Sequence, residues 1–364
     1  MKQRLYYFDM LKGLAIFFVV MGHVITMCIR DIDRAPLFKF IGEVHMPLFF
    51  FISGWFSMRC KDNQRPAAPS LIQRASRLLI PMIVVSTLWV FYFPGSGIQS
   101  PLPPGFEGLW SSSYKNGYWF TLVLFEITAV YAAATYLLGK QASFARECAV
   151  TVGGWIILVA ITMIIGPEIS AWTSLDLTST FFPVFMAGAI ARRHKDVFNV
   201  FCGKSGTITA ALLIASACFY YIGWPWNVSF HNPYLFMVCR VLLHLCLAII
   251  GIAAVRPWSE RAFADGTGTV AARLWAFLGR KSLAIYLLHY FFLFPLWSVK
   301  PAMEAMNLNL VPLAVFAAAV AAAVISIVLI ADYIIGLSAP LAFLLTGTEP
   351  AAKNKSNLKL QQTK

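Results

Sequence analysis

Long apolar runs, separated by short basic segments, make up most of this 364-residue sequence. Charged residues account for only 12% of it, about half the share that is typical of soluble domains. A helix of about 20 apolar residues crosses the hydrocarbon core of a bilayer with its backbone hydrogen bonds satisfied internally. The sequence therefore predicts an all-α, polytopic integral membrane protein, with the lipid bilayer as a partner. We expect about ten transmembrane helices, at residues 10–29, 41–58, 77–94, 118–138, 149–166, 179–191, 206–222, 234–255, 276–297 and 310–336.

Lysine and arginine are distributed unevenly between the segments that connect these runs. If the N-terminus is cytoplasmic, 22 of the 29 basic residues fall on the cytoplasmic side or in the cytoplasmic tail, and five fall outside. Because basic residues favour the cytoplasmic side of membrane proteins, we expect both termini to be cytoplasmic. The same distribution accounts for the net charge of +13 without nucleic acid as a partner.

The organisation along the chain is simple. Residues 1–345 are expected to form one transmembrane domain, and residues 346–364 a polar cytoplasmic tail. The first run is too long for a signal-peptide core and lacks a small-residue cleavage site, so we expect it to be retained. Residues 95–117, rich in Gly, Pro and Ser, are expected to form an irregular external lid. The sixth run carries FMAGA, a small-residue pattern that favours close helix packing.

The first run, YFDMLKGLAIFFVVMGHV, contains three ionisable residues: Asp9 and Lys12 near its start and His23 deep inside it. Eleven residues separate Lys12 from His23, a rise of about 16 Å and about half the hydrocarbon thickness. Eleven residues are also close to three full turns, so both side chains lie on one face of the helix. Histidine is the natural proton acceptor near neutral pH; the alternative is a histidine bonded to a neighbouring helix for packing alone.

Two further histidines are expected in the outer half of the bilayer. His45 opens the second run from the outer side, and His289 lies near the outer end of the ninth. If these helices pack together, both converge with His23, and structural and functional roles stay open for both. No carboxylate or cysteine accompanies them at ligand spacing, so we expect no metal site. Ser53, in FFFISGWF, offers a hydroxyl in a pattern that is more typical of helix packing than of a nucleophile.

Pairs of basic residues stand at the cytoplasmic starts of two other runs. Arg74 and Arg77 are three residues apart, so a helix places them on one face. Arg280 and Lys281 repeat the arrangement at the ninth run. Together with Lys12, these residues predict a clamp for a polyphosphate. The alternative is that they only anchor the helices at the membrane surface.

The other intramembrane polar residues favour structural roles. Glu126 and Arg240, in the fourth and eighth runs, are expected to form a salt bridge. Asp332, near the end of the last run, is open to the same interpretation. His244 follows Arg240 by four residues and is expected to be a polar group of the core.

Five of these motifs, taken in order, resemble a known family. FDMLKGLAIFFVVMGHV is similar to the opening helix of the membrane-bound acyltransferase 3 family, the bacterial O-acetyltransferases that modify lipopolysaccharide, peptidoglycan and other glycans. FFFISGWF, the Arg74 and Arg77 pair, YWFTLVLF and LGRKSLAIYLLHY resemble four further motifs of that family, in register over residues 7–290. The sequence departs from the family at Lys12, where the family usually has arginine. Lysine keeps the positive charge but lacks the planar guanidinium group that makes paired hydrogen bonds.

The resemblance implies an O-acyltransferase of the bacterial cytoplasmic membrane. It would move an acetyl group from cytoplasmic acetyl-CoA to a hydroxyl of a cell-envelope or lipid-linked glycan, with no permanently bound cofactor. His23 would be the general base or an acyl relay, Asp9 would orient Lys12, and His45 and Ser53 are further catalytic candidates. The implied donor-binding residues are Lys12, Arg74, Arg77, Trp119, Arg280, Lys281 and His289.

Two other functions remain open on the same residues. A transporter or flippase for glycans or lipid-linked sugars would use the intramembrane histidines for proton coupling. A structural subunit of a polysaccharide export complex would need them only for packing. Binding or cleavage of acetyl-CoA distinguishes the enzyme from both alternatives.

Overall fold

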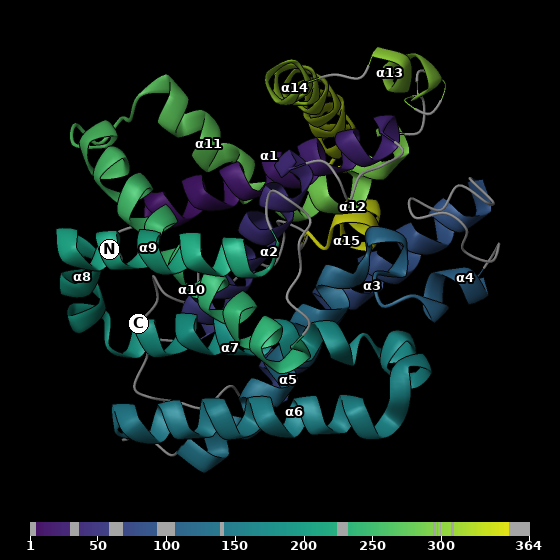
Figure 1. Cartoon of the computed structure of the whole chain (residues 1–364). Coiled ribbons are helices and arrows are strands. Elements are labelled where there is room, and N and C mark those ends of the chain that lie inside the picture. Colours follow the sequence, from purple (N-terminus) through teal and green to yellow (C-terminus); the bar gives the residue numbers. More distant parts are fainter. Residues whose placement is uncertain are drawn as a thin grey trace, which may run out of the picture.

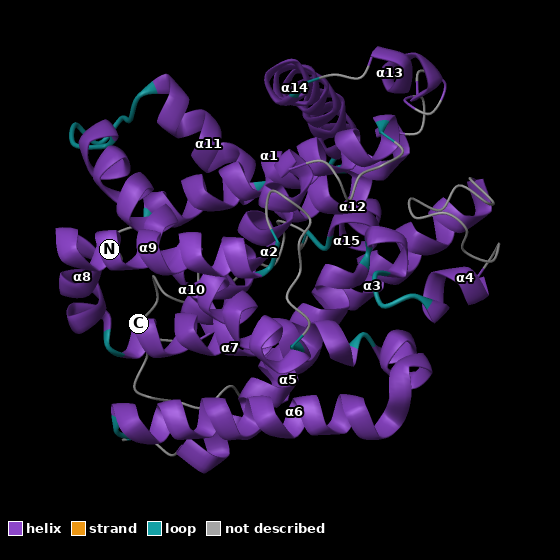
Figure 2. Ribbon diagram, in the orientation of Figure 1, coloured by secondary structure: helices purple, strands orange, loops and turns teal. Residues whose placement is uncertain are grey.

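The structure is a computed structural model that describes residues 5–29, 36–57, 68–92, 106–138, 142–223, 232–293, 296, 298, 300–306 and 309–348. The predicted tail from residue 349 onward and residues 95–105 of the predicted lid lie outside the described residues. Within the described ranges the regular structure is helical, with no strand, which confirms the all-α prediction (Figure 2). The elements are α1 (Tyr6–Cys28), α2 (Pro36–Ser57), α3 (Ala68–Tyr92), α4 (Phe106–Ser111), the 3₁₀ helix η2 (Lys115–Gly117), α5 (Trp119–Leu138), α6 (Phe144–Thr173), α7 (Leu175–Arg193), α8 (Lys195–Gly203), α9 (Ser205–Tyr221), α10 (Pro233–Ala262), α11 (Val270–Arg280), α12 (Ser282–Leu293), α13 (Lys300–Met306), α14 (Leu310–Ile335) and α15 (Ala339–Thr346).

Six of the described helices are long and apolar enough to cross a membrane, namely α1, α2, α3, α6, α10 and α14. The pair α8 and α9, bent by 79°, adds a seventh if the two form one span. Two shorter apolar helices, in α5 and α12, fall within two more of the predicted runs. The chain is therefore a multi-pass membrane protein, and the count of ten spans stays a prediction.

Several predicted boundaries differ from those in the structure; α3, for example, begins at Ala68 and not at residue 77. The run at 276–297 is divided at Lys281 into α11 and α12. The last run ends at Ile335, within one residue of its predicted end, and a separate helix, α15, follows it. The run at 149–166 continues to Thr173 across a kink at Gly166, whose φ of 79° is accessible to glycine at little cost. Pro167 follows this residue and lacks the N–H that a straight helix would need there.

Helix α1 lies in the middle of the helical assembly (Figure 1). It contacts α2, α10, α11, α12, α13 and α14, and most of its residues are buried. An apolar helix that is enclosed on all sides belongs to the core of the protein. Helix α6, at the edge of the assembly, instead exposes apolar side chains such as Ile156, Ile157 and Ile164, as expected of a lipid-facing helix.

Helices α2 and α7 approach so closely that only glycine fits at two positions between them. A Cβ atom at Gly188 of α7 would lie 2.0 Å from the carbonyl oxygen of Phe51 in α2. Gly54 of α2 makes the reciprocal approach to the carbonyl oxygen of Phe185, at 1.9 Å. The structure thus confirms the close packing expected of FMAGA, which contains Gly188.

Candidate active site

A cavity of about 160 Å³ lies between α1, α2, α3, α5 and α12. Its wall is mostly apolar, and four residues with polar side chains contribute to it: Lys12, Ser53, Ser282 and Tyr286. Concave apolar sites with a few polar groups are typical of small-molecule binding. The remaining lining residues are Ile16, Val19, Met46, Phe49, Leu78, Phe120, Leu124 and Leu283.

The cavity follows one face of α1. Lys12, Ile16 and Val19 line it at positions i, i+4 and i+7 of the helix, a spacing that places side chains along one stripe. His23 continues this stripe at i+11, one turn beyond Val19. The expectation that Lys12 and His23 share a face is therefore confirmed, with an apolar cavity beside the stripe between them.

The Lys12 end of the cavity is held by an ion pair and by close helix packing. Lys12 Nζ lies 3.0 Å from Asp9 Oδ1, one turn earlier on α1. A Cβ at Gly279 of α11 would lie 1.8 Å from the backbone oxygen of Asp9, and Gly13 approaches α11 in the same way. The close contact with α11 fixes the backbone from which both charged side chains project.

At the other end of the α1 stripe, beyond the lining residue Val19, His23 meets two residues of α12. Its Nε2 lies 2.8 Å from the hydroxyl oxygen of Tyr290. Its ring centroid is 5.3 Å from that of His289 and 4.8 Å from that of Tyr290. The predicted convergence of His23 with His289 is confirmed, and Tyr290 joins the pair.

His289 is fixed by its own helix. Its Nδ1 lies 3.0 Å from the backbone oxygen of Ile285 and 2.8 Å from that of Tyr286. The side chain is fully buried. Its Nε2 and the Nδ1 of His23 have no hydrogen-bond partner among the described residues.

A turn between η2 and α5 holds the tyrosines of α12. The Tyr286 hydroxyl donates to the backbone oxygen of Gly117 at 2.8 Å and accepts from the N–H of Phe120 at 3.1 Å. Gly117 has a φ of 94°, and a Cβ there would lie 1.8 Å from the Tyr290 hydroxyl oxygen. Only glycine can therefore occupy position 117 beside Tyr290.

Lys115 anchors this turn from inside the protein. Its ammonium group donates to the backbone oxygens of Trp110, Ser112 and Ala171, at 3.1, 2.7 and 2.5 Å. Burial lowers the pKa of Lys115 to about 8, so it stays mostly protonated at pH 7. This end of the predicted lid is thus an ordered turn, which corrects the expectation of an irregular segment across 106–117.

A family model described as an acyltransferase domain matches residues 5–331. The chain belongs to this acyltransferase family. The matched range contains every candidate site residue from Asp9 to His289. It also contains each of the five helices that surround the cavity.

Two nodulation proteins named NolL are similar to parts of the chain. The protein from Sinorhizobium fredii is 32% identical over 142 residues, which is 36% of this chain and 37% of that protein. The protein from Mesorhizobium japonicum is 36% identical over 85 residues, which is 22% of each chain. The match thus spans at most 37% of the length of these curated relatives. No solved structure matches the chain significantly.

Of the five predicted cations, Lys12 lines the cavity, and the other four are neighbours in sequence of lining residues. Leu78, a lining residue of α3, follows Arg77 directly and lies one turn after Arg74. Ser282, another lining residue, follows Arg280 and Lys281, and the ammonium of Lys281 forms an ion pair with Asp332 Oδ2 at 2.7 Å. Asp332 therefore forms a structural ion pair, a role that the sequence had left open.

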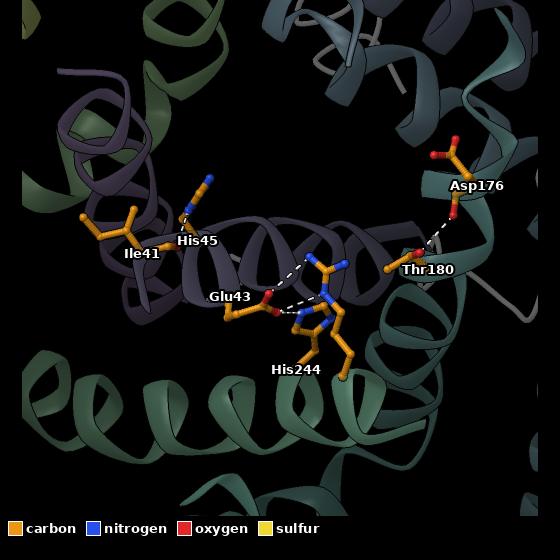
Figure 3. Close-up of polar contacts among 7 residues, drawn as sticks. Ile41, Glu43, His45, Asp176, Thr180 and His244 are labelled. Carbon is orange, nitrogen blue, oxygen red and sulfur yellow. Dashed lines mark hydrogen bonds and ion pairs between the residues drawn. The ribbon is translucent and has the colours of Figure 1, made fainter. Parts of the chain in front are cut away.

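The other predicted residues are divided between the cavity and the surrounding core. Ser53 lines the cavity. Trp119 packs against the rings of Phe50 and Phe181, with centroids 6.2 and 5.4 Å away. His45 Nδ1 bonds to the backbone oxygen of Ile41, one turn earlier on α2 (Figure 3). No three His, Cys, Asp or Glu side chains within the described ranges gather into a group that could hold a metal ion.

A second polar cluster joins α2 to α10 outside the cavity. Glu43 Oε1 lies 3.2 Å from a guanidinium nitrogen of Arg240, and Glu43 Oε2 lies 2.6 Å from Nε2 of His244 (Figure 3). The predicted pairing of Arg240 with Glu126 is therefore wrong, since Glu126 instead accepts a hydrogen bond of 2.5 Å from Thr178. His244 is fully buried, which confirms its expected place in the core.

Three residues near the histidines were missed by sequence reasoning. Tyr290 directly follows His289 and was not singled out, and Tyr286, the tyrosine of the motif LGRKSLAIYLLHY, was given no role. Glu43 precedes His45 by two residues in an otherwise apolar run, and a carboxylate in that place indicates a buried partner. That signal was available, whereas nothing in the sequence pointed to a contact between Gly117 and Tyr290.

Removing Arg240 should destabilise the protein more than removing both charges of the cluster. Arg240→Met leaves the carboxylate of Glu43, whose side chain is only 15% exposed, without its cation. We expect a cost of about 3 kcal/mol, and a partial recovery in the double variant with Glu43→Gln. The melting temperatures of both variants can be measured in detergent with a dye that reacts with buried cysteines, such as Cys28 and Cys218, as they become exposed. Equal melting temperatures for Arg240→Met and the unmodified protein would contradict this role of the cluster.

Proposed function

We propose that this protein is a membrane acyltransferase that moves an acetyl group from acetyl-CoA on the cytoplasmic side to a hydroxyl of a cell-envelope or lipid-linked glycan. The observation that carries the proposal is the apolar cavity beside the α1 face that leads from Lys12 to His23, in a chain that belongs to an acyltransferase family. Lys12 stands at one end of this face, and a pair of histidines stands at the other.

The dimensions of the site support a coenzyme A thioester as the donor. The eleven residues from Lys12 to His23 rise about 16 Å along the helix, a length comparable to that of an extended pantetheine arm. Lys12, Arg74, Arg77 and Arg280 supply positive charge for its phosphates within one turn of the cavity. The apolar wall between the two ends suits an arm that carries few charged groups.

The chemical step takes place beside His23. In the proposal, Asp9 orients Lys12 through their 3.0 Å ion pair, and His23 contacts the reacting thioester and hydroxyl groups. Ser53 and His45 lie on α2, which forms one side of the cavity. The acceptor approaches from the outer side, where the turn at Lys115–Gly117 covers the tyrosines of α12.

We also propose the finer topology that the charge distribution favours, with ten spans in a bacterial cytoplasmic membrane and both termini in the cytoplasm. The support is the 22-to-five split of basic residues and the position of the shorter apolar helices α5 and α12 within two of the predicted runs. Reporter fusions to the C-terminus and to residues 95–105 test this topology. An external C-terminus would overturn it.

Filling the cavity should block use of the donor. Leu124→Trp adds bulk to a lining position of α5, whereas Leu213→Trp places the same side chain on α9, where Leu213 is 68% exposed. With labelled acetyl-CoA, the purified unmodified protein and Leu213→Trp should release coenzyme A and transfer the label, and Leu124→Trp should lose at least about tenfold. A purified protein that neither binds nor cleaves acetyl-CoA would favour the transporter or the export subunit instead. Equal activity of both tryptophan variants would remove the cavity from the mechanism.

A further inference from the structure

We propose that His289 takes the proton from the acceptor hydroxyl, and that Tyr290 holds His23 in the state in which it donates a hydrogen bond to the reacting atoms. The inference rests on the proposed acyltransferase function and assigns its proton transfers. It gives the role of general base, which the sequence favoured for His23, to His289. The hydrogen-bond partners of the two rings carry this assignment.

The tautomer of His289 follows from its surroundings. Its Nδ1 faces the backbone oxygens of Ile285 and Tyr286, at 3.0 and 2.8 Å. Backbone oxygens only accept hydrogen bonds, so Nδ1 of the neutral ring carries the proton and Nε2 carries the lone pair. This Nε2 is buried without a partner among the described residues. A buried acceptor without a partner is costly, and a substrate hydroxyl would satisfy it.

The tautomer of His23 follows from Tyr290. The Tyr290 side chain is fully buried, and within the described chain its hydroxyl bonds only to Nε2 of His23, at 2.8 Å. A buried O–H group needs an acceptor, so Tyr290 donates to Nε2. The proton of neutral His23 then lies on Nδ1, which has no partner among the described residues. The free nitrogen of His23, Nδ1, is therefore a hydrogen-bond donor, and the free nitrogen of His289, Nε2, is an acceptor.

The surrounding contacts keep Tyr290 in this position. Its hydroxyl lies against Gly117, where a Cβ would be 1.8 Å away. Its ring lies 5.2 Å from that of Tyr118 and 6.0 Å from that of Trp89. Gly117 is in turn bound by the Tyr286 hydroxyl at 2.8 Å. The hydroxyl of Tyr290 is thereby aimed at His23 by packing on several sides.

The distance between the rings of His23 and His289 is compatible with both rings bonding to one pair of reacting groups, the acceptor hydroxyl and the thioester carbonyl. The ring centroids are 5.3 Å apart, so two oxygen atoms of one reacting centre, each hydrogen-bonded to one ring, can lie next to each other beside the two rings. In the proposed step, Nε2 of His289 removes the hydroxyl proton as the acceptor oxygen attacks the thioester carbonyl. Nδ1–H of His23 donates to the carbonyl oxygen as its negative charge develops. Collapse breaks the C–S bond, and the thiolate takes the proton from His289, leaving ester, free thiol and both histidines neutral.

Two variants and one spectroscopic signature test the assignment. His289→Gln keeps a polar group near the Nε2 position but cannot accept a proton, so kcat should fall at least about 100-fold with little change in the KM for acetyl-CoA. Tyr290→Phe should lower kcat by about tenfold without a change in KM. In ¹⁵N spectra of histidine-labelled protein, both His23 and His289 should carry the proton on Nδ1, and Tyr290→Phe should shift only His23 away from this form. His194→Gln, at the junction of α7 and α8, is the matched control.

Each result bears on the assignment. A His289→Gln variant with normal kcat and a raised KM would overturn it and place His289 in donor binding. A proton on Nε2 of His289, or an unchanged His23 in Tyr290→Phe, would also overturn it, even if one variant failed to fold. An unmodified protein that cleaves no acetyl-CoA would instead overturn the proposed function, before any variant is compared.

Discussion

Replacing His23 by alanine should lower acyl transfer about 100-fold or more while the protein stays folded. His23 lies at the end of the cavity-lining stripe of α1, and its Nε2 is bonded to Tyr290. Removal of one hydrogen-bond donor to a developing oxyanion costs about 10²–10³ in rate. The affinity for acetyl-CoA should change little, because Lys12 lies about three turns away from His23 on α1. Single-turnover transfer from labelled acetyl-CoA, together with a binding titration, measures the two effects separately.

A second histidine serves as the control for this experiment. His194, at the junction of α7 and α8, bonds to Glu147 at 2.8 Å, and it does not line the cavity. His194→Ala should therefore transfer at a nearly normal rate. A folded His23→Ala protein that retains more than a tenth of the normal rate would show that His23 has a packing role.

Gly188→Ala should destabilise the protein strongly, because it adds a methyl group within the close contact of α2 and α7. The new Cβ would lie 2.0 Å from the backbone oxygen of Phe51 and 3.0 Å from the N–H nitrogen of Trp55. Backbone atoms cannot move aside as a flexible side chain can, so α2 and α7 must separate along the contact. We expect a loss of about 3 kcal/mol or more, seen as a lower melting temperature and a lower yield of monodisperse protein in detergent.

Gly153→Ala is the matched control on α6. Its Cβ would meet nothing within 4 Å, and alanine is favoured over glycine inside a helix by about 0.5–1 kcal/mol. This variant should melt at the same temperature as the unmodified protein or slightly above it. If Gly188→Ala behaves in the same way, the close approach of α2 and α7 is not a property of the folded protein.

Much of the fold follows from the sequence because long apolar runs in a bilayer have few alternatives to helices. Runs at 10–29, 41–58 and 310–336 coincide closely with α1, α2 and α14. The break at Lys281 was missed. The apolar residues that follow it suggested one continuous helix, whereas the structure has a new helix that begins at Ser282. At Gly166 the predicted run ended too early. In the structure the helix bends at Gly166, and α6 continues after Pro167 to Thr173.

The site was predictable along one helix and less so between helices. The common face of Lys12 and His23 follows from helical periodicity alone, and the cavity beside it confirms that face. The contact of Gly117 with Tyr286 joins residues 169 positions apart, and no local pattern contains it. The partner of Arg240 was misassigned for the same reason: the sequence showed that a buried cation needs a carboxylate, but not that Glu43 rather than Glu126 lies beside it.

The central claim is that an acetyl group passes from acetyl-CoA, beside His23, to a glycan hydroxyl. The most direct measurement is mass spectrometry of cell-envelope glycans after growth on isotopically labelled acetate. Cells that produce the unmodified protein should carry labelled acetyl esters on a glycan, and cells that produce equal amounts of folded His23→Ala protein should lack them. Identical glycan acetylation in both cultures, or none in either, would contradict the claim.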